Sequence, residues 1–247
     1  MAPSTLTTAP TLTLNPEPLT RESFAPFGTA IIPPLPRTTT NPPTPLNTHP
    51  KNKSVPEPVS ANQGSALKYS PISPLTDYYS KWNCPSGKPS EARMSMFSCF
   101  PRQLRNIGGE SGKRVFDVGI LERHPFTTQT FAPLGLSHDS ETFYLVIVAP
   151  SLTGTTQPAE LDSGETVTIS NPPDLSKIRA FVARGDQAVT YGAGTWHAPM
   201  VVLGSQRVDF VVSQFVNGVG DEDVQEVRFP EGVNVEVGGR EKGRAKL

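Results

Sequence analysis

Two short clusters of polar residues could carry acid–base or metal chemistry. The first reads Glu122-Arg123-His124, and Gln129 follows five residues after the histidine. Alternate side chains of a strand share a face, so Glu122 and His124 should point the same way and Arg123 outward. The second cluster spans 192–197, where two glycines predict a tight turn and His197 follows on the outgoing strand. Because an imidazole titrates near neutral pH, either histidine suits proton transfer.

These clusters resemble the two motifs of the cupin family, which line a barrel mouth and usually hold a metal ion. In the first motif, Glu122 stands in the place of a histidine and Gln129 in the place of the acidic ligand. The second motif keeps Gly194-x-x-His197 but lacks its proline. The resemblance implies a divalent-ion site made of Glu122, His124, Gln129 and His197, in which Gln is a poor ligand for a transition metal. Taken alone, each histidine also fits a hydrogen-bonded structural role.

The elements that must position these residues are mostly short strands rich in β-branched or aromatic residues, with Gly, Pro, Asp or Asn between them. We expect strands at 94–100, 115–122, 129–132, 143–149, 179–183, 188–191, 200–203, 208–215, 224–229 and 233–237. Two short helices are expected at 20–27 and 174–179, capped by Thr20 and Asp174. This pattern predicts an all-β, cupin-like antiparallel β-barrel of the jelly-roll type with a few short helices. At 247 residues it fits a single domain, 1–247.

Composition narrows the partners. The net charge of −1 argues against nucleic acid or an anionic membrane, and leaves a small-molecule ligand as the expected partner. The two cysteines, Cys84 and Cys99, have no metal or redox spacing, and reduced thiols are favoured over a disulfide. A Pro/Thr-rich surface loop is expected at about 33–58 and a flexible polar tail at about 238–247. The tail ends in Ala245-Lys246-Leu247, which differs from the Ser-Lys-Leu peroxisomal address only at its first residue, so we expect the peroxisome or the cytoplasm. An import receptor would then be a further partner.

Longer stretches resemble the ureidoglycolate lyase family. They read LERHP at 121–125, TQTFAPL at 128–134 and WHAPM at 196–200, and ANQG at 61–64 and KY at 68–69 match as well. The resemblance is collinear from about residue 19 to residue 229, which makes it more specific than any single motif. It implies a cupin-like barrel, commonly a homodimer, that splits (S)-ureidoglycolate into glyoxylate and urea in allantoin and purine catabolism. Nickel stimulation is associated with some bacterial members.

The chain departs from that family at two places. Bacterial members often read WHHP where this chain has Ala198 after His197, and they tend to carry an arginine in the strand that here reads FSCF at 97–100. The second departure moves the binding of the substrate carboxylate onto another cation.

The implied elimination needs a base for the hydroxyl proton, an acid for the departing nitrogen and a cation for the carboxylate. We expect His197 and Glu122 to form the proton-transfer pair, with His124 oriented by Glu122 or acting in its place. Glu122 would itself be a base if apolar surroundings raise its pKa. For the carboxylate the candidate is Lys68, and for the urea group Asn62 and Gln129.

Two other functions fit the same residues. A different cupin enzyme, such as a metal-dependent dioxygenase or isomerase, would require a stoichiometric transition metal. A non-catalytic barrel would bind a small acid without turnover.

Overall fold

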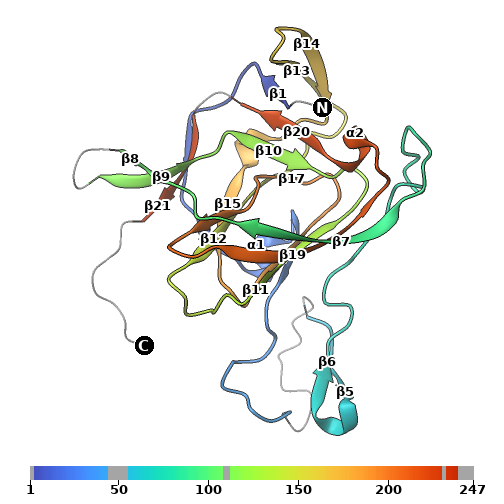
Figure 1. The fold of residues 1–247 in the computed structure, drawn as a ribbon, viewed down its shortest axis with the longest axis vertical. Helices are drawn as coiled ribbons and strands as arrows, with labels where there is room; N and C mark the ends of the chain where they lie inside the picture. Colours follow the sequence, from blue (N-terminus) through green and yellow to red (C-terminus); the bar gives the residue numbers. More distant parts are fainter. Residues whose placement is uncertain (1–2, 44–54, 108–111, 230–231, 239–247) are drawn as a thin grey trace.

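The computed structural model describes residues 3–43, 55–107, 112–229 and 232–238. Its regular structure is almost entirely β-strand, in sheets of ten, five, four and two strands (Figure 1). The all-β prediction with a few short helices is therefore confirmed. Among the described strands, hydrogen bonding does not close any sheet on itself, so the expected closed barrel is not formed; the larger sheets instead pack on one another.

The ten-stranded sheet is the central layer and carries most of the candidate site. In spatial order it contains β14 (Thr166–Ser170), β13 (Thr156–Glu160), β1 (Ser4–Leu6), β20 (Gln225–Arg228), β10 (Ile120–Arg123), β17 (Trp196–His197), β12 (Phe143–Ala149), β15 (Arg179–Ala183) and β3 (Glu17–Pro18), with β18 (Val201–Leu203) also paired to β12. Strand β12 is almost fully buried because both of its faces are covered. Val146 belongs to one core cluster and Ile147 to the other, which explains its continuous apolar sequence.

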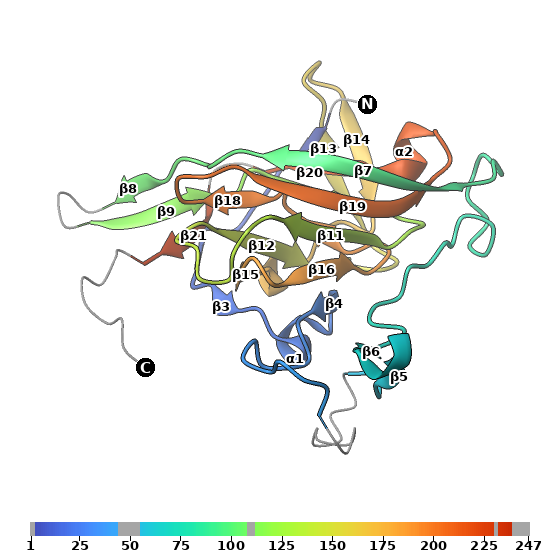
Figure 2. The same ribbon diagram turned by 60° about the horizontal axis from the view of Figure 1, so that its bottom comes forward.

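The five-stranded sheet covers one face of this central layer (Figure 2). Its order is β4 (Gly28–Ile31), β16 (Ala188–Tyr191), β11 (Gln129–Leu134), β19 (Val208–Val216) and β7 (Glu91–Cys99). An aromatic core fills the space between the two sheets: Phe131 lies 5.9 Å from Phe210, which meets Tyr144 of β12 edge-to-face at 5.1 Å. Edge-to-face pairing of this kind adds to the burial of the rings.

The other face of the central layer packs on the four-stranded sheet. That sheet contains β2 (Leu12–Leu14), β21 (Val233–Val237), β9 (Lys113–Asp117) and β8 (Arg105–Ile107). Its alternating stretch at 233–237 buries Val233, Val235 and Val237 and leaves the residues between them half-buried, as the sequence predicts.

Short helices occupy the expected places with altered lengths. Helix α1 (Arg21–Phe24) starts at Thr20, whose side chain accepts a hydrogen bond from the Ser23 amide. The segment after Asp174 forms only a 3-10 turn, η2 (Leu175–Lys177). Helix α2 (Gly220–Asp223) was not expected.

A small hairpin leads away from the packed sheets. It consists of β5 (Val59–Ala61), the turn η1 (Asn62–Gly64) and β6 (Ala66–Lys68), and it lies apart from the main sheets in both views (Figures 1 and 2). Of the predicted Pro/Thr-rich loop, 44–54 lies outside the described residues, as does 239–247 of the predicted tail. No helix of the described chain is long and apolar enough to cross a membrane.

Candidate active site

Glu122, His124 and His197 meet inside the protein. Strands β10 and β17 pair so that Glu122 stands opposite His197, and His124 follows directly after β10. One ligand atom from each of the three lies within 4.8 Å of the others. The expected convergence of the two sequence clusters is therefore present. His197 is almost fully buried and His124 nearly so, whereas the Glu122 side chain is 20% exposed.

Backbone carbonyls fix the tautomer of both histidines. Nδ1 of His124 lies 2.6 Å from the Asp223 carbonyl oxygen, and Nδ1 of His197 lies 3.1 Å from the Thr195 carbonyl oxygen. Because a carbonyl only accepts hydrogen bonds, each Nδ1 must carry its proton and donate. In the neutral form of a ring its Nε2 atom therefore presents a lone pair, and both Nε2 atoms are buried without a well-aligned hydrogen bond among the described residues.

Acceptor atoms gather at this point. His197 Nε2 lies 3.3 Å from Glu122 Oε1. Gln129, at the start of β11 in the facing sheet, donates from its Nε2 to Gln214 Oε1 at 2.6 Å, and its own Oε1 is buried with no hydrogen-bond partner among the residues that the structure describes. Lone pairs that face one another repel, so this arrangement favours a positive species among them, either a proton or a metal ion.

The pKa values follow from burial and from this pairing. Burial raises the pKa of Glu122, but the contact with His197 and the positive charge that the two imidazoles carry when protonated outweigh it, so the pKa of Glu122 is lowered overall. The raised pKa that would make Glu122 a base through apolar surroundings is therefore not found; it is an ionised carboxylate. Burial, together with the charge of His197, lowers the pKa of His124 to about 4, which keeps that ring neutral.

These donor atoms fit a divalent metal ion. Two imidazoles whose Nδ1 atoms are held by carbonyls and whose Nε2 atoms point to one place form the arrangement that metal-binding histidines usually adopt. Glu122 adds one carboxylate oxygen, and Gln129 Oε1 offers an uncharged oxygen of lower affinity.

Tyr191 is a site neighbour that the sequence did not single out. Its ring stacks on His197 with 3.9 Å between ring centroids and 12° between the planes. Its hydroxyl is buried and has no hydrogen-bond partner in the described part of the chain, and burial raises its pKa well above the usual range, so it stays protonated. The one available signal was its place just before Gly192, on the strand that enters the histidine turn.

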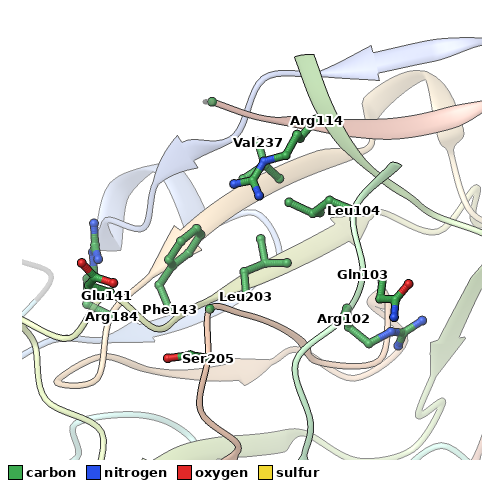
Figure 3. A pocket seen from close by; sticks show the side chains of 12 residues that line it. Arg102, Gln103, Leu104, Arg114, Glu141, Phe143, Arg184, Leu203, Ser205 and Val237 are labelled. Carbon is green, nitrogen blue, oxygen red and sulfur yellow. The ribbon is translucent and has the colours of Figure 1, made fainter. Parts of the chain in front are cut away.

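The cavity beside Glu122 has a volume of about 310 Å³. Its lining is Phe97, Cys99, Phe100, Arg102, Glu122, Phe131, Pro199 and Met200. This volume is at the lower end for small-molecule sites, which suits a small substrate. A larger groove of about 970 Å³ shares Arg102 with this cavity, is lined by Arg114, Glu141 and Arg184 among others, and contains none of the converging residues (Figure 3).

Three predicted residues lie differently from what we expected. Asn62 and Lys68 sit exposed on the β5–β6 hairpin, and the structure does not bring them to Glu122 within the chain (Figure 1). Arg123 does point to the face opposite Glu122, but the expectation that it faces outward is wrong because it is 5% exposed. It stacks over Trp196 at 4.8 Å, and it donates to the carbonyl oxygens of residues 170 and 171, which close over it.

Comparison with known proteins identifies the family. A family model described as ureidoglycolate lyase matches residues 11–236. The chain belongs to the ureidoglycolate lyase family. The ureidoglycolate lyase of Schizosaccharomyces pombe is 32% identical over 207 residues, covering 84% of this chain and 86% of the relative. That of Saccharomyces cerevisiae is 34% identical, covering 81% and 85%, and that of Burkholderia mallei is 31% identical, covering 89% and 91%. The ureidoglycolate lyase resemblance that the sequence motifs predicted is therefore confirmed.

Proposed function

We propose that the chain splits ureidoglycolate into glyoxylate and urea at the Glu122–His197 pair, as a carbon–nitrogen lyase of allantoin and purine catabolism. The observation that carries this proposal is the meeting of an ionised carboxylate and an imidazole at 3.3 Å beside a small cavity, in a chain of this family.

The reaction moves two protons. Ureidoglycolate carries a hydroxyl, a carboxylate and a ureido nitrogen on one carbon. As the hydroxyl proton leaves, its oxygen becomes the carbonyl of glyoxylate, and the carbon–nitrogen bond breaks as the nitrogen gains a proton to complete urea. Glu122, ionised, accepts the hydroxyl proton, and His197 in its protonated form gives its Nε2 proton to the nitrogen. The contact between the two side chains then lets the proton return from Glu122 to His197 for the next cycle.

In a metal-bound form, a divalent ion, nickel by family resemblance, would be held by Glu122, His124 and His197, with Gln129 beside them, and Glu122 and His197 would then act as ligands instead of as the proton-transfer pair. When bound, it would polarise the substrate oxygens as a Lewis acid. His124, neutral and anchored through Nδ1, would serve as a ligand and not as an acid.

The test uses purified full-length protein and (S)-ureidoglycolate, with and without a chelator. Urea and glyoxylate are expected, and release of ammonia instead would contradict the proposal. Glu122→Gln and His197→Gln should each lower kcat by about a hundredfold or more, since general acid–base groups contribute about 10²–10⁴-fold. His138→Gln is the matched control, because His138 lies outside the site and pairs with Asp186 at 2.7 Å. Binding of the acid without turnover would favour a non-catalytic protein, and a protein that binds a stoichiometric transition metal but does not split ureidoglycolate would favour another metal-dependent enzyme.

The proposal also covers the oligomeric state and the cellular compartment of the protein. A homodimer is supported by the exposed apolar side chains of edge strand β7, where Met94 is 74% exposed and Met96 58%. Light scattering of the wild type and of Met96→Lys tests the homodimer, and a monomeric wild type would reject it.

The cupin-like jelly-roll architecture is likewise a proposal, which rests on the two sequence motifs.

For the peroxisome, the support is the terminal tripeptide Ala245-Lys246-Leu247, which lies outside the described residues. A fluorescent fusion should give organelle puncta that disappear when the tripeptide is removed. A diffuse signal in both forms would place the protein in the cytoplasm.

A further inference from the structure

The cavity beside Glu122 has an electrostatic requirement that the converging residues do not meet. Ureidoglycolate is an anion, and the carboxyl group of Glu122 lines the cavity that would receive it. Two carboxylates close together in a partly buried cavity repel strongly. A cation at the wall of the cavity is therefore needed to hold the substrate carboxylate.

Arg102 is the only positively charged residue among the described residues that line this cavity. It sits between β7 and β8, and its position is fixed by the central sheet. The preceding residue, Pro101, forms a bridge with Val202, and the Arg102 amide donates to the Val202 carbonyl oxygen at 2.8 Å. The backbone at Arg102 is therefore already fixed in the ligand-free protein.

The donors of Arg102 remain free to bind an anion. Its guanidinium carbon lies 5.2 Å from the centre of the Phe116 ring, and no ion pair with a carboxylate is found for it in the described part of the chain. A guanidinium that stacks on a ring uses its flat face and keeps its in-plane N–H groups for a two-point contact with a carboxylate. Arg102 also lines the larger groove, so its side chain lies at the border between the two spaces (Figure 3).

The geometry points to Arg102 as the residue that binds the substrate carboxylate and selects for acids. This inference rests on the proposed function and assigns the role for which the sequence had suggested Lys68.

The test compares ureidoglycolate with its carboxamide analogue, which has the same shape and no negative charge. Arg102→Gln in the full-length protein should lower kcat/KM for ureidoglycolate at least about tenfold, mainly through KM, because a charged hydrogen bond is lost. For the carboxamide the change should be small, so the preference for the acid falls by the same factor. Arg102→Lys should restore part of the preference, since it returns the charge but not the two-point contact.

Two cations serve as matched controls. Arg105→Gln removes an arginine three residues away that pairs with Asp117 at 2.6 Å outside the cavity, and Lys68→Gln removes the alternative cation. Both variants should keep the preference for the acid. The inference is overturned if Arg102→Gln keeps that preference, or if Lys68→Gln loses it.

Two further measurements distinguish a folding defect from a loss of function: the melting temperature of each variant and the release of urea by the wild type. The melting temperature of each variant shows whether it is folded, and if Arg102→Gln does not fold, the acid preference of Arg102→Lys decides. A wild type that releases no urea would reject the proposed function itself, whereas an active wild type with an unaffected Arg102→Gln rejects only the assignment of Arg102.

Discussion

Replacing Tyr191 by Phe should stabilise the protein, whereas the same change at Tyr144 should destabilise it. Both tyrosines are fully buried in the core between the ten-stranded and five-stranded sheets. They differ in what their hydroxyls contact. Tyr144 donates to the Gln187 carbonyl oxygen at 2.6 Å, while the Tyr191 hydroxyl has no hydrogen-bond partner among the described residues.

The magnitudes follow from this difference. A buried polar group without a partner costs about 1–3 kcal/mol, so removing the Tyr191 hydroxyl should raise the free energy of unfolding by about 1 kcal/mol after relaxation of the core. Tyr144→Phe removes a donor and leaves the Gln187 carbonyl without its hydrogen bond, which should lower the free energy of unfolding by about 1–2 kcal/mol. For a chain of this size, 1 kcal/mol corresponds to a shift in melting temperature of about 2–4 °C.

Urea unfolding of the metal-free proteins, with calorimetry as a second measurement, distinguishes the two signs. The slope of the free energy with urea should be unchanged, so the midpoint alone reports stability. Tyr191→Leu separates ring from hydroxyl: it loses the stack on His197 and leaves a cavity, and should cost about 2–4 kcal/mol. The reasoning fails if Tyr191→Phe is destabilised as Tyr144→Phe is, since the hydroxyl would then have a partner.

Three further changes have definite signs. In metal-free protein the pKa of His124 is about 4 against 6.5 in the unfolded chain, so the unfolded chain binds this proton first as the pH falls. The contribution of the neutral His124 ring to the free energy of unfolding is therefore complete above pH 6.5 and is lost as the pH falls toward 4, by up to about 3 kcal/mol. His124→Asn should flatten the dependence of the free energy of unfolding on pH in that range. Arg123→Lys should cost about 2–4 kcal/mol in urea unfolding, because a lysine cannot reproduce the fork of hydrogen bonds to Gln225 and residues 170–171 or the stack on Trp196; a change below 0.5 kcal/mol would contradict this. Gly28→Ala should lower the free energy of unfolding by roughly 2–4 kcal/mol, since Gly28 has φ +148° and a Cβ there would lie 1.9 Å from the Thr190 carbonyl oxygen; unchanged stability would mean that the strand pair can separate.

Strand positions were predictable because they depend on local pattern. The apolar run at β12 and the alternation at β21 are visible in the sequence and are found as strands. The Glu122–His124 face was predictable for the same reason, and so was the turn that carries His197. The local pattern of a strand does not show which distant segment packs against each of its two faces. Arg123 points away from Glu122 as alternation requires, but the backbone of residues 170–171 closes over it, and those residues belong to a distant segment.

The choice of cation depends on the same kind of information. Lys68 was selected because it stands in a stretch that resembles the family, yet that stretch forms a hairpin apart from the main sheets (Figure 2). Arg102 gave no local signal, because its importance depends on the bridge between Pro101 and Val202, which brings together residues about a hundred positions apart. Only a tertiary contact of this kind distinguishes one exposed arginine from another.

The orphaned polar atoms give the strongest physical reason to regard this region as a functional site. His124 Nε2, His197 Nε2, Gln129 Oε1 and the Tyr191 hydroxyl are all buried without partners in the described protein, and they come from both of the packed sheets. At about 1–3 kcal/mol each, their combined cost is comparable with the whole stability of a typical domain. Apolar side chains of similar size would avoid that cost at every one of these positions. Their presence is therefore best explained by a species that enters the site and pairs with these atoms, whether substrate, proton or metal ion. Binding of such a ligand should raise the free energy of unfolding of the wild type. The increase should be smaller in a variant in which apolar groups replace these polar atoms.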